Sequence, residues 1–368
     1  MRFPILQFGT SRFLQAHVDL FVSQALASGE AIGRIVVVQT TSSLESRKRL
    51  AVFAAGDPFD VEIKGLVNGT VVDERIEVTS IGGGVDANEE WTEVERLFNQ
   101  ARCAISNTAD RGYESHSGDG PDTQVPRSFP AKLAKLLLAR HRAGVGPITL
   151  FPCELVEANG QALRAAVLGV LDAWDAPAEA RRWIKDDCIW VNSLVDRIVS
   201  QPLRPAGAVA EPYALWAIEN QPGLELPCRH ADIVVTDDLK PYERLKLFIL
   251  NLGHSFIAEG WVKRDSDPAM TVREAMADEA VRDDLDALYN EEVLPVFAGI
   301  GLGEQAQAYR DSVIDRFHNP FLDHRLADIV TNHIAKKQRR FGGLIELAQA
   351  SGLHISQPRL RAALAQGG

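Results

Sequence analysis

The spacing of hydrophobic residues gives the chain two parts of different character. In the first part, short apolar runs predict strands, at residues 3–8, 35–38, 103–107, 148–153 and 189–193. Segments with apolar residues at helical spacing alternate with them and predict helices, at residues 13–27, 91–100, 130–142 and 161–174. After about residue 220, long helical patterns take over, at residues 246–254, 272–288, 321–337 and 343–350. The pattern predicts an α/β domain with a parallel sheet, followed by a mainly α-helical domain.

The first strand ends at Gly9, and a helix and a second strand follow at the distance expected of a βαβ unit. This arrangement predicts a Rossmann-like dinucleotide-binding domain. The turn reads Gly9-Thr10-Ser11-Arg12-Phe13-Leu14, so only the first glycine of the usual G-x-G-x-x-G fingerprint is present. Backbone N–H groups at the start of the helix at Arg12 still offer an anion site for a pyrophosphate. Further along, Asn68-Gly69 predicts a hairpin over residues 62–79.

The length of 368 residues is enough for about two domains, which we place at 1–225 and 226–368. Hydrophobic residues make up 46% of the chain and charged residues 24%, as is ordinary for a globular enzyme. The net charge of −11 argues against a nucleic-acid partner, because phosphate binding needs clustered Lys and Arg. No apolar run approaches the length of a membrane span, and we expect a protein without a membrane partner. Either a monomer or a dimer fits this composition.

The cysteines are far apart and show neither a CxxC pair nor a zinc-ligand spacing; they are Cys103, Cys153, Cys188 and Cys228. This pattern predicts no metal site and no disulfide framework. The N-terminus begins on a strand-like segment without the features of a signal peptide. We therefore expect a cytoplasmic protein.

The candidate chemistry lies in the apolar segment 246–254, which carries Lys246, Asn251 and His254. Residues on an α-helix turn by about 100° each, so these three are predicted to share one sector and to face one cavity. Burial makes a lysine a usable general acid or base, an amide donates to an oxyanion, and an imidazole orients the same oxygen. The set suits metal-free oxidation of a secondary alcohol. The alternative is that the lysine extends to solvent and the histidine is a core residue.

The spacing Lys-x4-Asn-x2-His resembles the signature of the mannitol dehydrogenase family of polyol-specific long-chain dehydrogenases. Further segments resemble the tagaturonate reductase branch of that family; they lie at 8–14, 106–108, 128–133, 152–160, 194–199, 209–212, 236–254 and 319–321. The resemblance implies a Rossmann domain, a helical substrate domain, NAD-linked reduction of a sugar-derived ketone, and no metal.

The resemblance also implies roles for single residues. Lys246 is the expected catalytic lysine, Asn251 the oxyanion donor and His254 a substrate-orienting residue. Lys336 is an expected basic substrate contact. Arg197, Asp196 and Glu154 are further candidates for substrate binding, and Arg197 equally suits a structural ion pair. The expected cofactor-binding residues are Phe8, Gly9, Thr10, Ser11, Arg12, Phe13, Thr40, Ser42, Asn107 and Thr108.

Departures from the family pattern bear on the substrate. Glu154 and Leu155 stand where mannitol dehydrogenases carry an Asp-Asn pair, and Asp328 stands where they carry an arginine. Both changes favour a keto acid over a simple hexitol. Ser11 and Gln15 replace the second glycine and the arginine of the family fingerprint, and the C-terminal part is shorter than in tagaturonate reductases.

The choice of cofactor is left open by the segment 39–43, which follows the second strand without the acid that usually binds the ribose of NAD. Its hydroxyl groups, followed by Arg47, Lys48 and Arg49, suit the 2′-phosphate of NADP. These basic residues equally suit a solvent-facing helix start, and the resemblance implies NAD.

The leading hypothesis is an NAD(P)-dependent enzyme that interconverts a hexonate such as altronate and its keto acid, a tagaturonate-like compound. At a net charge of −11, such a substrate needs local positive potential, for which Lys246, Lys336 and Arg197 are the candidates. One alternative is a mannitol-type polyol or ketose dehydrogenase. Another is a non-catalytic homologue that binds a nucleotide or a sugar acid as a sensor, suggested by the altered glycine turn.

Overall fold

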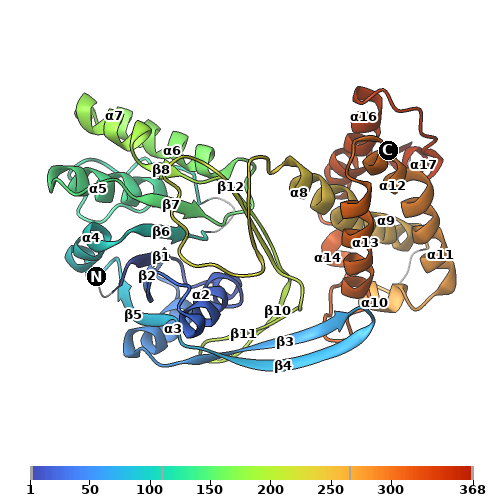
Figure 1. Cartoon of the computed structure of the whole chain (residues 1–368), viewed down its shortest axis with the longest axis horizontal. Helices are drawn as coiled ribbons and strands as arrows, with labels where there is room; N and C mark the ends of the chain where they lie inside the picture. The colour runs from blue at the N-terminus through green and yellow to red at the C-terminus, as the bar shows by residue number, and fades with distance from the viewer. Residues whose placement is uncertain (1–2, 109–111, 265–266, 366–368) are drawn as a thin grey trace. The chain divides into compact units, whose positions relative to one another are not determined.

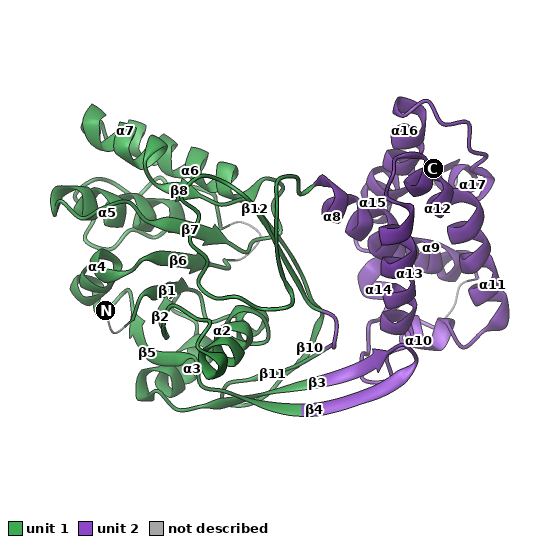
Figure 2. Cartoon of the chain, in the orientation of Figure 1, with its two compact units in different colours: residues 1–62, 75–210, 214–239 green, residues 63–74, 211–213, 240–368 purple. Residues whose placement is uncertain are grey.

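The computed structural model describes residues 3–108, 112–264 and 267–365 (Figure 1). The chain forms two compact units (Figure 2). The first, here called the Rossmann unit, comprises Met1–Glu62, Arg75–Ala210 and Ala214–Leu239. The second, here called the helical unit, comprises Ile63–Glu74, Glu211–Tyr213 and Lys240–Gly368. The predicted division into folding domains at 225/226 stays a prediction, because these units are defined by packing alone.

A six-stranded parallel sheet with the order β5-β2-β1-β6-β7-β8 forms the centre of the Rossmann unit. Its strands are β1 Ile5–Phe8, β2 Ile35–Gln39, β5 Ile81–Asp86, β6 Cys103–Ser106, β7 Thr149–Pro152 and β8 Ile189–Trp190. Four of them are buried along their whole length, as the continuous apolar runs predict for a sheet covered on both faces. The predicted α/β class is confirmed.

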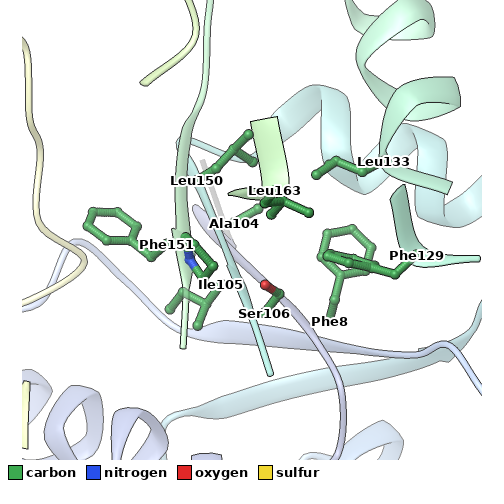
Figure 3. A pocket seen from close by; sticks show the side chains of 10 residues that line it. Phe8, Ala104, Ile105, Ser106, Phe129, Leu133, Leu150, Phe151 and Leu163 are labelled. Carbon is green, nitrogen blue, oxygen red and sulfur yellow. The ribbon is translucent and has the colours of Figure 1, made fainter. Parts of the chain in front are cut away.

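Helices cover this sheet; they are α1 Arg12–Gln15, α2 Val18–Ser28, α3 Leu44–Ala55, α4 Trp91–Gln100, α5 Phe129–Arg142, α6 Asn159–Ala173 and α7 Ala178–Asp186. The predicted helix 13–27 is interrupted at Ala16 and His17. The core packs tightly: a cavity of about 10 Å³ lies between Phe8, Phe129 and the strands β6 and β7 (Figure 3). That space is about enough for a single water, so this cavity is too small for a ligand.

The predicted hairpin is confirmed as β3 Phe59–Val67 and β4 Thr70–Val78. Its turn has positive φ at both central residues, 50° at Asn68 and 72° at Gly69, as a two-residue hairpin turn requires. The two strands continue the sheet β10-β11-β3-β4, with β10 Val199–Pro202 and β11 Ala208–Ala210. A third sheet contains β9 Ser193–Asp196, β12 Leu215–Glu219 and β13 Ile233–Thr236.

The helical unit is built around one apolar cluster. Its α-helices are α8 Lys240–Leu245, α9 Leu252–Lys263, α10 Val272–Ala275, α11 Glu279–Leu288, α12 Leu294–Gly299, α13 Gly303–Phe317, α14 Leu326–Ile329, α15 His333–Lys337, α16 Gly343–Ala350 and α17 Pro358–Ala365. Two of the long helices predicted here are divided. Asp278 caps a new helix, with Oδ1 accepting from the Ala280 N–H at 3.0 Å, and Asn332 has a left-handed φ of 57° before α15.

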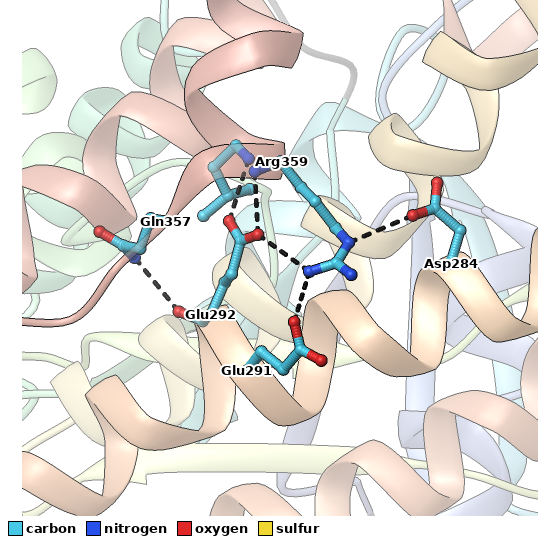
Figure 4. Close-up of polar contacts among 6 residues, drawn as sticks. Asp284, Glu291, Glu292, Gln357 and Arg359 are labelled. Carbon is cyan, nitrogen blue, oxygen red and sulfur yellow. Dashed lines mark hydrogen bonds and ion pairs between the residues drawn. The ribbon is translucent and has the colours of Figure 1, made fainter.

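A buried carboxylate fixes the start of α17. Glu292 has an exposed fraction of 0%, and its oxygens accept from the backbone N–H groups of Arg359 at 2.9 Å and Leu360 at 3.1 Å (Figure 4). An anion at this position satisfies free N–H groups and interacts favourably with the helix dipole. The Arg359 side chain also binds Asp284 and Glu291, so several contacts hold the last helix in place.

Three π-helical segments continue α-helices of this unit, η1 Lys246–Asn251, η2 Tyr289–Val293 and η3 Gln338–Gly342. The prediction of regular α-helical geometry over 246–254 is therefore wrong for its first six residues. The hydroxyl of buried Tyr289 donates to the Ile249 carbonyl at 2.9 Å, inside η1. A Cβ at Gly253 would collide with that hydroxyl, so the glycine makes room for the tyrosine. Such π segments are frequent at functional sites.

Candidate active site

The turn after β1 is shaped by one glycine. Gly9 has a φ of 113°, and a Cβ at this residue would lie 2.8 Å from the Asn107 carbonyl oxygen. The Gly9 N–H donates to the Val38 carbonyl at 3.0 Å, which ties the turn to β2. Only glycine combines this backbone conformation with so close an approach. The turn therefore retains the tight geometry that a pyrophosphate-binding loop needs, although two glycines of the fingerprint are missing.

The polar side chains of the turn contact the protein itself. The Ser11 hydroxyl accepts from the Leu14 N–H at 3.1 Å and caps α1. The Thr10 hydroxyl accepts from Arg49 at 3.0 Å. The Arg12 guanidinium donates to the carbonyls of Leu203 and Gly207, and burial lowers the pKa of this group. In this arrangement the Arg12 side chain holds the loop before β11, and backbone groups remain the candidates for binding a phosphate.

The aromatic residues of the predicted cofactor set pack within the protein. Phe8 is 1% exposed, and its ring lies 5.4 Å from that of Phe129. Half-buried Phe13 stacks on His17 at 4.7 Å. The Phe8 side chain is thus a core residue, which leaves its backbone as the part that can line a cofactor site.

The ends of β6 and β7 are joined through Glu154. Its carboxylate accepts from the Ser106 hydroxyl at 3.1 Å, the Thr108 N–H at 2.9 Å and the Tyr113 hydroxyl at 2.9 Å. Burial, followed by the charge of Glu154, raises the pKa of Tyr113, so the tyrosine remains a donor. Asn107 donates to the Cys153 carbonyl at 2.8 Å. These contacts indicate that Glu154 positions the segment carrying Asn107 and Thr108, a role that the sequence did not predict.

An acidic residue of the neighbouring strand β5 lies beside the end of β2. Buried Asp86, the last residue of β5, accepts from the Gln39 side chain at 3.2 Å. Arg47 lies 3.9 Å from Asp86 and 3.5 Å from Glu89. The basic residue considered as a 2′-phosphate ligand is therefore paired with two acids. Thr40 is half-buried and Ser42 is exposed at the same edge.

Asp196 and Arg197 belong to the Rossmann unit, at and just after the end of β9. Both are buried, and Arg197 donates to the Ala16 carbonyl at 2.8 Å. This contact connects Arg197 to the end of α1, next to the glycine turn.

The catalytic candidates follow one another along the helical unit. Lys246 begins η1, Asn251 ends it, and His254 lies in the first turn of α9. In a π-helix residue i is bonded to residue i+5, so Asn251 lies one turn from Lys246. Both are half-buried, whereas His254 is 7% exposed. The prediction that the three side chains share one cavity stays a prediction.

The surroundings of His254 include residues that the sequence did not indicate. Its ring lies 4.6 Å from that of Phe317 and 4.8 Å from that of His324, edge to face. Burial lowers the pKa of His324, with an opposing effect of Asp328 and a further lowering by Lys336. His324 therefore lies within electrostatic range of Lys336, and the predicted residues His254 and Lys336 belong to one neighbourhood.

Lys336 and Arg340 complete this neighbourhood. The Lys336 ammonium donates to the Ile329 carbonyl at 2.8 Å. Arg340 donates to the Asn251 carbonyl at 3.0 Å and to the Ser255 hydroxyl at 2.6 Å. Sequence reasoning missed Arg340, although its spacing of four residues from Lys336 places both on one helix face.

Neither a metal-binding cluster nor a membrane-spanning helix is found among the described residues. Residues 3–108, 112–264 and 267–365 contain no group of three or more His, Cys, Asp or Glu side chains arranged to hold a metal ion. Within the same residues, no helix combines the length and the hydropathy that a bilayer span requires.

Comparison with known proteins identifies both parts of the chain. Residues 3–226 match the mannitol dehydrogenase Rossmann domain, and residues 238–366 match the mannitol dehydrogenase C-terminal domain. The altronate oxidoreductase of Bacillus subtilis (strain 168) is 32% identical over 95% of this chain and 76% of its own length. That of Klebsiella pneumoniae (strain 342) is 29% identical over 98% of this chain and 78% of its own length.

Solved structures show the same fold. A D-sorbitol dehydrogenase in substrate-free form has a TM-score of 0.84 at 21% identity, covering 99% of this chain and 79% of the other. The Pseudomonas fluorescens mannitol 2-dehydrogenase, solved with NAD and D-mannitol, has a TM-score of 0.73 at 21% identity and the same coverage. The family resemblance seen in the sequence motifs is confirmed. The chain belongs to the mannitol dehydrogenase family and is an NAD-dependent dehydrogenase that acts on CH–OH groups.

Proposed function

We propose that this enzyme interconverts a hexonate, altronate, and its keto acid, tagaturonate, with NAD as the cofactor. The observation that carries the proposal is the 32% identity to an altronate oxidoreductase over 95% of the chain. Two further features support it. The residues at positions 154 and 328 depart from the mannitol dehydrogenase pattern, and the helical unit gathers positive charge around Asn251 and His254.

The cofactor would be held by the turn at Gly9 and by the segment of Asn107 and Thr108. The close approach of Gly9 to the Asn107 carbonyl fits this role, because it brings the glycine turn and the end of β6 together. When bound, the nicotinamide supplies the hydride for ketone reduction or accepts it in alcohol oxidation. Glu154 keeps Thr108 in position by accepting from its N–H and its hydroxyl, and the adjacent Asn107 donates to the Cys153 carbonyl.

Lys246 acts as the general acid in the direction of reduction and protonates the ketone oxygen as negative charge develops on it. Asn251 donates a hydrogen bond to the same oxygen and stabilises the charge. His254, packed between Phe317 and His324, orients the substrate. In alcohol oxidation, Lys246 accepts the hydroxyl proton.

Preference for NAD over NADP follows from the charges at the end of β2. Asp86 adds a negative charge beside Gln39, and Arg47 is paired with Asp86 and Glu89. A 2′-phosphate would therefore meet the negative charge of Asp86, and Arg47 would have to leave its two acids to bind it. The four cysteines are reduced and buried, which suits a protein of the cytoplasm.

The test is nucleotide-dependent turnover on a panel of ketouronates, aldonates, ketoses and polyols. We expect the highest kcat/KM with tagaturonate and NADH, and NADH to bind about tenfold more tightly than NADPH, with Arg47→Ala changing neither affinity more than about twofold. Preference for mannitol or fructose would establish the polyol alternative. NADH binding without turnover of any compound would establish a non-catalytic homologue.

A further inference from the structure

Two cations lie next to each other beside the candidate oxyanion donor of the helical unit. Lys336 is in α15 and Arg340 is in η3, one turn further along. Both side chains are half-buried. The segments η1 and η3, which contain Asn251 and Arg340, pack against each other.

Neither cation has an acidic partner among the described residues. Lys336 donates to the Ile329 carbonyl, and Arg340 uses its Nη1 for the Asn251 carbonyl and the Ser255 hydroxyl. No carboxylate lies within ion-pair distance of either group in the part of the chain that the structure describes, and the Arg340 Nε and Nη2 donate to no acceptor there.

Other buried cations of the same unit differ in this respect. Lys337, adjacent to Lys336, is 2.9 Å from the Glu259 carboxylate. Arg316 is 2.7 Å from Glu211, and both side chains are almost fully buried. A buried charge without a partner is costly, and the unit supplies a carboxylate to these two cations. Lys336 and Arg340 are only half-buried and have no such carboxylate among the described residues, so their charges stay open to an anion from solution.

The two charges also affect each other. Burial, followed by the charge of Arg340, lowers the pKa of Lys336. Burial, followed by the charge of Arg339, lowers the pKa of Arg340 to about 10. A bound anion would offset both the loss of hydration and the repulsion between the like charges.

We propose that Arg340, with Lys336 beside it, binds the carboxylate of the sugar acid and makes the enzyme select acids over neutral polyols. A guanidinium can hold a carboxylate through two parallel hydrogen bonds, and the Nε and Nη2 of Arg340 are available for such a pair. The bond from Arg340 to the Asn251 carbonyl fixes this group relative to the residue that polarises the reacting oxygen. This inference rests on the proposed function and assigns to Arg340 the distinction between sugar acids and neutral polyols.

The test compares Arg340→Gln with Arg339→Gln, which removes the same charge from the exposed neighbouring residue. Loss of a charge-assisted pair should raise KM for altronate about 10- to 100-fold in Arg340→Gln, with a smaller change in kcat. KM for a neutral hexitol should stay within about twofold, and Arg339→Gln should resemble the wild type for both substrates. Arg340→Lys, which keeps the charge and loses the planar fork, should be intermediate.

A binding measurement makes the result independent of turnover. Altronate, gluconate and mannonate should each raise the Tm of the wild type and of Arg339→Gln, and not that of Arg340→Gln, while NADH raises all three. An equal rise in KM for acid and hexitol, or an aldonate-induced Tm rise that survives in Arg340→Gln, would overturn the inference. So would a wild type that responds to no aldonate. Turnover of polyols alone, with the Arg340-dependent Tm rise intact, would instead refute the proposed function.

Discussion

Candidate site residues lie at the carboxyl edge of the sheet and around Lys336 and Arg340 in the helical unit. The polar groups of these two regions differ in their hydrogen-bond partners. At the sheet edge, Glu154 and Arg12 are engaged by neighbouring hydroxyl, N–H and carbonyl groups. In the helical unit, Lys336 and Arg340 have carbonyl and hydroxyl acceptors and no acid among the described residues. Backbone groups can bind a cofactor that many enzymes share. Recognition of a particular substrate needs side chains that no acid of the protein already occupies. We infer that substrate selection is concentrated in the helical unit.

Lys246→Met is the sharpest test of whether cofactor binding belongs to the Rossmann unit and substrate chemistry to the helical unit. Loss of the general acid and base should lower kcat by about 10²- to 10⁴-fold at neutral pH in both directions. The affinity for NADH, measured by fluorescence titration, should change less than about twofold, because the cofactor-binding candidates lie in the Rossmann unit. Lys263→Met, at an exposed lysine in the last turn of α9, is the matched control. A kcat within a few-fold of the wild type would exclude Lys246 from the chemistry.

Asp19 is a buried carboxylic acid of the Rossmann unit. It is 0% exposed in α2, and burial raises its pKa to about 7 from an ordinary 3.8, an effect that Gln7 partly opposes. Below the unfolded pKa both states are protonated and stability is greatest. As pH rises toward 7, the unfolded chain releases the proton that the folded protein still holds, so stability is lost.

Asp19→Asn should therefore be more stable than the wild type above pH 7, by up to about 4 kcal/mol. The advantage should shrink steadily as the pH is lowered toward 4. Urea denaturation at pH 5 and pH 8 measures it, with Asp57→Asn at an exposed position as the control. A difference independent of pH would show that Asp19 is charged in the folded protein and has a compensating partner.

A smaller effect is expected from Gly9→Ala at the sheet edge. The φ of 113° and the 2.8 Å approach to Asn107 should cost about 1–3 kcal/mol, seen as a roughly tenfold or greater loss of NADH affinity. Gly29→Ala separates the effect of a positive φ from that of a close contact. Gly29 also has a positive φ, of 76°, but nothing lies near its added Cβ. It should lower stability and leave NADH binding unchanged. If both variants bind NADH normally, the turn does not hold the cofactor.

The sequence predicted the regular elements well because their causes are local. Continuous apolar runs located the parallel strands, and Asn68-Gly69 located the hairpin, since a positive φ at two adjacent positions favours these residues. The motif at Gly9 identified the turn even with two glycines missing. These features depend on neighbours in the chain.

What the sequence did not predict depends on distant residues. The π-helix η1 involves Tyr289, whose hydroxyl reaches Ile249, and no periodicity in 246–254 indicates that contact. The different surroundings of Lys336 and Lys337 arise from Glu259, which lies on another helix. In the sequence, Lys336, Lys337, Arg339 and Arg340 form one basic run typical of a solvated surface. Tertiary contacts alone show that Lys337 pairs with an acid, whereas Lys336 has none among the described residues.

The segments 63–74 and 211–213 have a consequence for how this enzyme can diversify. Although they precede the C-terminal part of the chain, they pack within the helical unit, where Asn319 donates to the Lys64 carbonyl at 3.1 Å and Arg316 pairs with Glu211. A genetic crossover near residue 239 would join a new C-terminal half to a hairpin tip and a buried glutamate inherited from the other parent. Such chimaeras should fold only between parents that match at these contacts, so new substrate ranges are expected to arise through point substitutions more readily than through exchange of whole halves.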